Sequence, residues 1–229
     1  MVEIIAKKSN WNLYTSSIGD YHPGHRDDGE AKKLGLERAI APGMWLASHI
    51  ETFIPRDYYL SALNLVKFSG RVYDGDRIEI INGENNFKFL RDGKRVCSIN
   101  GLISEQYKES PRQFEAPIFG YETAVSQEDV REFNNSIGSK KDYLLDMHLA
   151  SLSAPALLEY GRKRGQLGIH RGQSFVKHED FEVGPTDVLI DREESKGDRE
   201  GNTLYSFQLQ WVQGGYVIAS GKSTVVSSG

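Results

Sequence analysis

Apolar residues recur at helical spacing in several stretches of the chain. Two short stretches, 11–18 and 130–137, have the spacing i, i+3, i+7 that is typical of one helix face. The second begins with Ser126 and Asp129, a capping-box pair, and ends at Gly138, which favours helix termination. We therefore predict a helix over this second stretch and a related lead-in over the first.

Two further stretches, 44–53 and 149–164, are apolar on nearly all sides, so we predict two buried helices. Each is followed by segments in which apolar and polar residues alternate, the pattern of strands. Because antiparallel strands follow each helix without a second large helix, the economical arrangement is a sheet curled around the helix, an α+β fold. The predicted strands are 62–70, 76–83, 86–93 and 94–104 after the first helix, and 173–181, 186–195, 202–213 and 216–226 after the second.

The two halves of the chain repeat similar segments in the same order. The offsets between matched segments are 119, 113 and 110 residues, so the second half has lost about nine residues (119 − 110). Two such units are expected to pair and to imitate a two-fold dimer. We predict one unit at 1–108, a linker at 109–122 and a second unit at 123–229. The matched segments are SSIGD (16–20) with NSIGS (135–139), APGMWLASHIE (41–51) with APALLEYGRKR (154–164), and LVKFSGRVYDGD (65–76) with FVKHEDFEVGPTD (175–187).

Composition narrows the function classes. The 229 residues include 28 Lys+Arg and 32 Asp+Glu, with no basic stripe, which argues against a nucleic-acid partner. No apolar run approaches the roughly 20 residues that span a bilayer, and the start of the chain lacks signal-peptide features, so we expect a cytoplasmic location and no membrane partner. The single cysteine, Cys97, rules out an intramolecular disulfide and is expected to be a small buried or half-buried side chain.

A loop before the first buried helix, residues 16–25 (SSIGDYHPGH), concentrates titratable groups. It holds Asp20 and His25, and the following helix opens with Pro42 and Gly43. A carboxylate can deprotonate a water and an imidazole can pass a proton. A glycine N–H at a positively polarised helix start can stabilise an oxyanion. These groups are the ones that addition to an unsaturated thioester requires.

Two plainer interpretations of the loop remain open. In the first, Asp20 caps a turn and His25 is a surface histidine. In the second, His22, His25, Asp27 and Asp28 bind a metal ion, although no further histidine or cysteine pair at metal-binding spacing supports this, and we predict no metal.

The repeat favours the chemical interpretation. The second half carries Ser139 and Leu144 where the first carries Asp20 and His25, so the fold does not require the pair. This is the pattern of a duplicated enzyme that has kept one working site.

The same residues resemble the signature of the MaoC-like hot-dog-fold dehydratases, which include R-specific enoyl-CoA hydratases. That signature runs Gly-Asp-x-Asn-Pro-aliphatic-His-x-Asp, then alanine and glycine, and later Ile-x-His-Gly-Met on the central helix. The match covers residues 9–105 closely and the second half in outline. The resemblance implies two tandem hot-dog domains, one catalytic and one degenerate, that form a pseudo-dimer capable of further homo-oligomerisation. The matching residues are Gly19, Asp20, Pro23, His25, Asp27, Ala31, Gly35, Ile40, Gly43 and Met44.

The resemblance implies a hydro-lyase of fatty-acid metabolism that hydrates a trans-2-enoyl thioester, or dehydrates a 3-hydroxyacyl thioester, without a cofactor. Acyl-CoA is the expected small-molecule substrate. Asp20 would be the base toward water, His25 its partner and the proton donor to the α-carbon, and Gly43 the oxyanion donor. We expect the substrate also to contact Met44 and Trp45 on the helix.

We also expect Lys67 to lie near the CoA phosphates. Four residues depart from the family pattern. His22 and Gly24 replace an asparagine and an aliphatic residue and can change loop rigidity and the pKa of His25. Pro42 replaces a histidine and has no backbone N–H, so an oxyanion contact must come from Gly43. Glu51 places a charge where some family members carry a hydroxyl group.

Two other functions stay open. In a hot-dog thioesterase, Asp20 would direct water to the carbonyl carbon instead of the alkene. In a binding module, the chain would hold an acyl thioester without turning it over.

Overall fold

The computed structural model describes residues 2–54, 59–83, 86–104, 111, 113–197 and 202–227. The strands are β1 (Val2–Ile5), β2 (Tyr59–Phe68), β3 (Arg77–Asn82), β4 (Asn86–Arg91), β5 (Lys94–Ser104), β6 (Phe119–Val125), β7 (Ile169–Lys177), β8 (Gly184–Gly197), β9 (Thr203–Gln213) and β10 (Tyr216–Ser227). The helices are α1 (Lys8–Ile18), α2 (Pro23–Arg26), α3 (Asp28–Lys33), α4 (Gly43–Ser48), the 3-10 helix η1 (His49–Thr52), α5 (Gln127–Ser136), α6 (Asp146–Ser151) and α7 (Ser153–Lys163).

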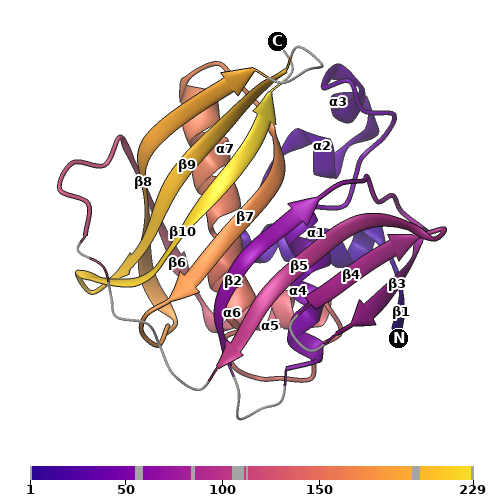
Figure 1. Cartoon of the computed structure of the whole chain (residues 1–229), viewed down its shortest axis with the longest axis horizontal. Helices are drawn as coiled ribbons and strands as arrows, with labels where there is room; N and C mark the ends of the chain where they lie inside the picture. Colours follow the sequence, from indigo (N-terminus) through magenta and orange to yellow (C-terminus); the bar gives the residue numbers. More distant parts are fainter. Residues whose placement is uncertain are drawn as a thin grey trace.

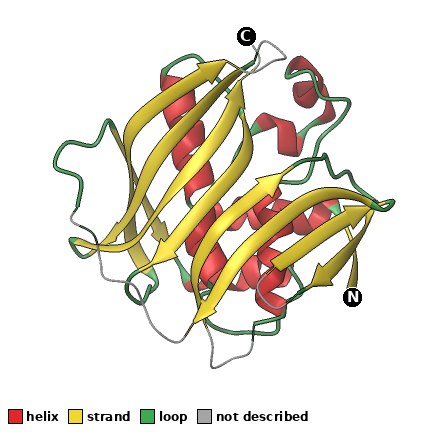
Figure 2. Cartoon of the chain, in the orientation of Figure 1, coloured by secondary structure: helices red, strands yellow, loops and turns green. Residues whose placement is uncertain are grey.

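The strands form one ten-stranded antiparallel sheet in the order β1-β3-β4-β5-β2-β7-β10-β9-β8-β6. Five strands come from each half, in matching order from edge to centre, and β2 pairs with β7 where the halves meet. Figures 1 and 2 show this curved sheet in front of α1 and α4 to α7. The predicted α+β hot-dog class is confirmed, since an antiparallel sheet covers a buried helix in each half.

The central helices match in a different register from the one predicted. Met44–Ser48 (MWLAS) and Met147–Ser151 (MHLAS) occupy the equivalent helices α4 and α6, an offset of 103 residues. In both, the serine hydroxyl donates to the methionine carbonyl one turn earlier, at 2.7 and 2.6 Å. The pairing of 41–51 with 154–164 is therefore wrong. Between the turn segment and the central helix, the second half is sixteen residues shorter than the first (119 − 103). Between the central helix and the matched strand, it is seven residues longer (110 − 103).

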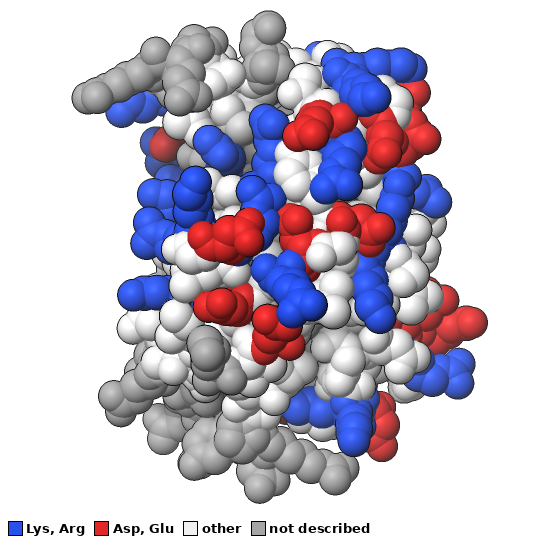
Figure 3. Space-filling view, turned by 90° about the vertical axis from the view of Figure 1, so that its right-hand side faces the viewer, with Lys and Arg blue, Asp and Glu red and all other residues white. Residues whose placement is uncertain are grey.

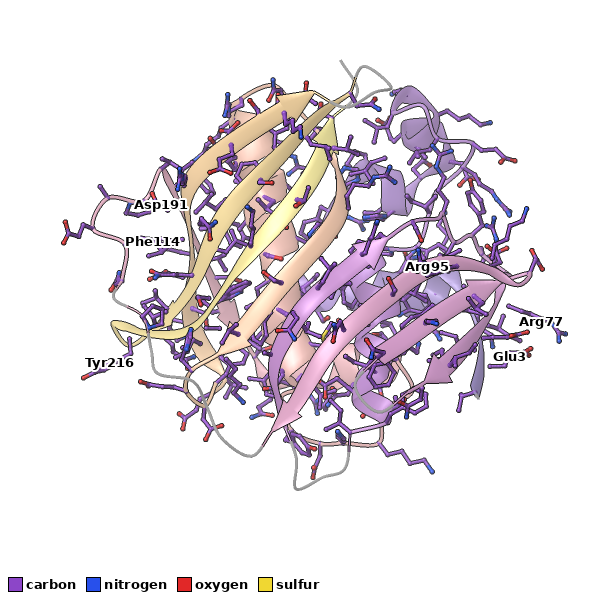
Figure 4. The ribbon with its side chains drawn as sticks, viewed as in Figure 1. Glu3, Arg77, Arg95, Phe114, Asp191 and Tyr216 are labelled. Atoms are coloured by element: carbon purple, nitrogen blue, oxygen red, sulfur yellow. The ribbon has the colours of Figure 1, made fainter. Side chains whose placement is uncertain are left out.

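Both sheet edges are strands that the alternation did not predict. β1 pairs with β3, and there Arg77 Nη1 lies 3.6 Å from Glu3 Oε1, a pair visible at the edge in Figure 4. β6 pairs with β8 and includes residues 119–122, the end of the predicted linker, whereas 109, 110 and 112 lie outside the described residues. β1 has only four residues, too few for an alternation to be recognised, whereas β6 alternates in burial but lies where the sequence analysis placed the linker. The division into domains stays a prediction.

One hydrophobic core lies between the sheet and the helices of both halves. Trp11 of α1 meets Trp45 of α4 edge to face at 5.9 Å, and Tyr14 of α1 contacts Phe133 of α5 at 5.5 Å between ring centroids. Cys97 on β5 is fully buried, as predicted, and burial raises the pKa of its thiol.

The surface and the helices add two observations. On the face in Figure 3, Lys and Arg side chains are interspersed with Asp and Glu. Within the described ranges, each helix is too short or too polar to span a bilayer.

Candidate active site

The end of α1 turns Asp20 into the protein. Gly19 adopts φ 73°, the left-handed region that glycine favours, and ends the helix. The Asp20 N–H then donates to Thr15 O at 2.9 Å, and the carboxylate Oδ1 accepts the His22 N–H at 3.1 Å. Asp20 is only 4% exposed and lines a cavity of about 730 Å³.

A single helical turn, α2, positions His25. The loop was predicted to be irregular, but Pro23 occupies the first helical position and His22 Nδ1 accepts the Gly24 N–H at 3.1 Å as a cap. Trp11 Nε1 donates to the His25 carbonyl at 3.1 Å, and His25 Nδ1 bonds Ile40 O at 2.9 Å. Backbone and ring of His25 are therefore both held in place.

The hydrogen bond to Ile40 decides the tautomer of His25. A carbonyl oxygen only accepts, so Nδ1 carries the proton and Nε2 of the neutral ring is an acceptor. His25 Nε2 lies 4.0 Å from Asp20 Oδ2. Neither acceptor has a hydrogen to donate to the other, and both can accept from one molecule that has two hydrogens to donate.

Burial controls the protonation of this pair. It lowers the pKa of His25 to about 4, against the opposing hydrogen bond to Ile40, so the imidazole is neutral at pH 7. It raises the pKa of Asp20 above its ordinary value of 3.8, opposed by His22 and by the positive charges of Arg162 and Arg26.

The second half forms the same turn without a carboxylate. Gly138 has φ 69°, the Ser139 N–H donates to Asn134 O at 2.9 Å, and Ser139 Oγ accepts the Lys141 N–H at 3.2 Å. These contacts reproduce those of Asp20, so a serine is sufficient for the turn. At the offset of 119 residues, Leu144 corresponds to His25. The second half has no helix equivalent to α2, however, and Leu144 lies in the chain two residues before α6 begins.

Gly43 lines the cavity at the start of α4, where its N–H has no acceptor within the helix. A Cβ at this position would lie 2.8 to 2.9 Å from carbons of the Phe68 ring. Glycine is therefore the residue that fits here while the ring keeps its place, and the structure brings Asp20, His25 and Gly43 to one cavity.

The other predicted contact residues lie elsewhere. Met44 is buried, and Trp45 donates its Nε1–H to Ser136 O at 3.1 Å; both belong to the core and are not among the cavity-lining residues. Lys67 is exposed on β2 and lines a second hollow of about 420 Å³, which shares Arg171 with the main cavity. Their roles in binding stay predictions.

Glu51 lies away from the cavity, at the junction of the two halves. It is 2% exposed, and Oε1 accepts the N–H of Met147 at the start of α6 at 2.9 Å. Lys141 Nζ is 3.9 Å from Oε2. The Glu51 side chain thus connects the two halves and does not face the cavity.

Sequence reasoning missed one histidine of the cavity wall. His170 on β7 lines the cavity, bonds Ser223 Oγ through Nε2 at 2.6 Å and meets Phe68 edge to face at 5.7 Å. It lies 145 residues from His25 (170 − 25), and no local pattern could link the two. Among the described residues, no group of three His, Cys, Asp or Glu side chains is arranged to hold a metal ion.

Comparisons with known proteins identify the fold. No family model matches the chain, and no curated protein matches its sequence. A structure described as a MaoC domain protein dehydratase from Chloroflexus aurantiacus is similar at TM-score 0.67 and 10% identity, covering 99% of this chain and 93% of that one. A MaoC-like dehydratase from Phytophthora capsici is similar at 0.62 and 11%, covering 99% and 95%.

A structure described as an oleoyl thioesterase from Lactobacillus plantarum is also similar, at TM-score 0.58 and 9% identity, covering 100% of this chain and 96% of that one. At these identities the likeness shows a shared fold. The resemblance seen in the sequence is thereby confirmed for the architecture of both halves together.

Proposed function

We propose that the protein hydrates trans-2-enoyl thioesters, or dehydrates 3-hydroxyacyl thioesters, in the cavity beside Asp20 and His25. One observation carries the proposal: two hydrogen-bond acceptors, His25 Nε2 and Asp20 Oδ2, lie 4.0 Å apart on a cavity that also contains the start of α4. A water that donates one hydrogen to each acceptor has its lone pairs free to attack a carbon.

Each group has a defined part in the reaction. Asp20 draws a proton from the water as its oxygen bonds the β-carbon, and the electrons of the double bond move to the thioester oxygen. The Gly43 N–H stabilises that oxyanion. His25 Nε2 cannot donate in its resting tautomer, so Asp20 passes the proton to Nε2, and His25 then delivers it to the α-carbon, which returns both groups to their resting states. The other hydrogen of the water stays in the new hydroxyl group, and no cofactor is needed.

Charge at the cavity rim supports an orientation for the substrate. Arg71 and Arg171 are exposed, line the rim and form no ion pair with a described residue. With Lys67 beside Arg171, they provide a basic border for the phosphates of a CoA thioester. The acyl group would then extend the other way, along α7.

The dehydratase descriptions of two structural neighbours support this reaction, and the thioesterase neighbour shows that the fold accommodates another one. An activity of this kind also fits the expected cytoplasmic location.

A two-signal assay with crotonyl-CoA tests the proposal. We expect enone absorbance to fall with time while no free thiol appears. Thiol release at the rate of enone loss would establish a thioesterase instead. No change in either signal across short and long enoyl-CoA substrates would leave the binding function.

The pH dependence of kcat/KM provides a second test. The Asp20 carboxylate must be ionised and His25 neutral, and burial raises the pKa of the first from 3.8 and lowers that of the second to about 4. We therefore expect activity to fall on the acid side, through an apparent pKa above 3.8. An acid limb that persists unchanged in His25→Ala would support assignment to Asp20. An acid limb with an apparent pKa near 6.5 that disappears in His25→Ala would contradict a neutral His25 imidazole at pH 6.

A further inference from the structure

A polar cluster in the wall of the cavity has no part in the proposed chemistry. It comes from the second half: Tyr160 and Arg164 at the end of α7, and Glu193 on β8, all of which line the cavity. The Tyr160 hydroxyl donates to Glu193 Oε2 at 2.6 Å, and Arg164 Nη1 donates to the same carboxylate and to the Tyr160 oxygen, the latter at 3.0 Å. The Glu193 side chain is 17% exposed and that of Arg164 43%.

The cluster exists because the second half has a longer central helix. The first-half helix runs over 43–52, ten residues, whereas α6 and α7 together span 146–163, eighteen residues. Tyr160 lies near the end of α7, and no described residue of the first-half helix corresponds to it. The polar cluster is therefore built from second-half residues.

An apolar path lies beside this cluster. Tyr205 and Phe207 on β9 line the cavity, and the Phe207 ring meets Tyr160 edge to face at 5.6 Å. Leu157 and Leu158 of α7 and Val225 of β10 line it as well. An extended aliphatic chain could run along these side chains and end at the polar cluster.

The cluster is far enough from the catalytic pair to meet the end of an acyl chain. Phe68, which packs against Gly43, is on β2, and Glu193 is on β8, the fourth neighbour of β2 in the sheet. At about 4.8 Å per strand this is roughly 19 Å along the sheet, and less in a straight line because the sheet curves. The rim arginines lie at the other end: Arg71 follows β2, and Arg171 is on β7.

We propose that Tyr160, Arg164 and Glu193 form a specificity site for the far end of the acyl group, and that this end carries a hydrogen-bonding oxygen. The inference rests on the proposed hydration activity. A methyl terminus against the cluster would remove water from Arg164 and Glu193 and replace none of its hydrogen bonds. A hydroxyl can donate to the second Glu193 oxygen and accept from the remaining N–H groups of Arg164.

Matched substrate pairs test the site in the wild-type protein. The pairs are trans-2-dodecenoyl-CoA with its 12-hydroxy derivative, and trans-2-hexadecenoyl-CoA with its 16-hydroxy derivative; crotonyl-CoA is the short reference. We expect kcat/KM to be at least about tenfold higher for the hydroxylated member of at least one pair, because sites built to bond a hydroxyl reject its absence strongly. Equal values within both pairs, or a preference for the plain chains, would overturn the proposal.

Two variants then locate the effect. Tyr160→Phe and Glu193→Gln are expected to reduce the preference to about threefold or less while crotonyl-CoA turnover stays near the wild-type rate. Tyr216→Phe and Glu194→Gln are matched controls, since Tyr216 projects from the β9–β10 turn in Figure 4 and Glu194 is exposed beside Glu193; both should keep the preference. A preference unchanged in both test variants would show that the cluster serves only the fold.

Failure of the hydration proposal is a separate outcome. It would appear as no turnover of crotonyl-CoA or of any longer chain. The same matched pairs can then be compared by calorimetric binding: tighter binding of the hydroxylated members, lost in Tyr160→Phe, would support the site, and equal binding would overturn it.

Discussion

Asp20→Asn is expected to lower kcat for crotonyl-CoA hydration by about a thousandfold and to leave KM nearly unchanged. An asparagine oxygen can still accept the His22 N–H that Asp20 accepts at 3.1 Å, so the loop keeps its conformation. The amide cannot take a proton from water, and loss of a general base typically costs 10²- to 10⁴-fold. Loss of enone absorbance measures the rate, and a melting curve checks that the variant folds.

The matched control is Asp27→Asn in the same loop. Asp27 accepts the Glu30 N–H at 2.9 Å as the cap of α3 and is exposed, and asparagine caps a helix equally well. Its kcat should stay within about twofold of wild type. A wild-type kcat of Asp20→Asn on every chain length would contradict the catalytic role of Asp20. A low kcat in both Asp20→Asn and Asp27→Asn would indicate that the loop is disrupted.

Glu51→Ala is expected to lower the free energy of unfolding by about 3 kcal/mol, the second large effect. It leaves the buried Met147 N–H without its acceptor and opens a space where the Glu51 side chain was buried. Glu51→Gln should cost less than about 1 kcal/mol, because its amide oxygen can still accept that N–H. Urea unfolding at pH 6 measures both, with Glu37→Ala, an exposed site, as control. An alanine variant as stable as the glutamine variant would contradict the contact.

Glu51 also makes stability depend on pH. Burial, with the nearby charge of Asp146, raises its pKa from 4.5 to about 7, above the value expected in the unfolded chain. Between about pH 5 and 7, Glu51 is protonated in the folded state and ionised in the unfolded state. The free energy of unfolding therefore falls as the pH rises through this range. We expect the wild-type protein to lose stability from pH 5 to 8 relative to Glu51→Gln. A constant difference between the two across this range would contradict the raised pKa.

The repeat shows how far sequence comparison reaches. The turn segments, SSIGD and NSIGS, were matched correctly because glycine is needed at the same left-handed position in both, Gly19 and Gly138. The central helices were matched ten residues out of register, since similar apolar composition in 41–51 and 154–164 outweighed the shorter pair MWLAS and MHLAS. Helical spacing identifies a buried helix but leaves its register open when all faces are apolar.

The sequence marked Glu51 only as a charge where some family members carry a hydroxyl group, and it left the role of this residue open. Its partners, Met147 and Lys141, are about 90 or more residues away along the chain, and only the packing of the two halves brings them together. The same separation concealed His170 and the cluster at Tyr160 and Glu193.

By itself the sequence predicted the α+β class, the buried helices and the catalytic candidates Asp20, His25 and Gly43, because each depends on residues close together in the chain. The tertiary structure alone decided the tautomer of His25, which Ile40 sets from across the loop, and the cavity wall contributed by the second half. Periodicity and turn chemistry act over a few residues, whereas burial, pKa and cavity shape depend on which distant segments pack together.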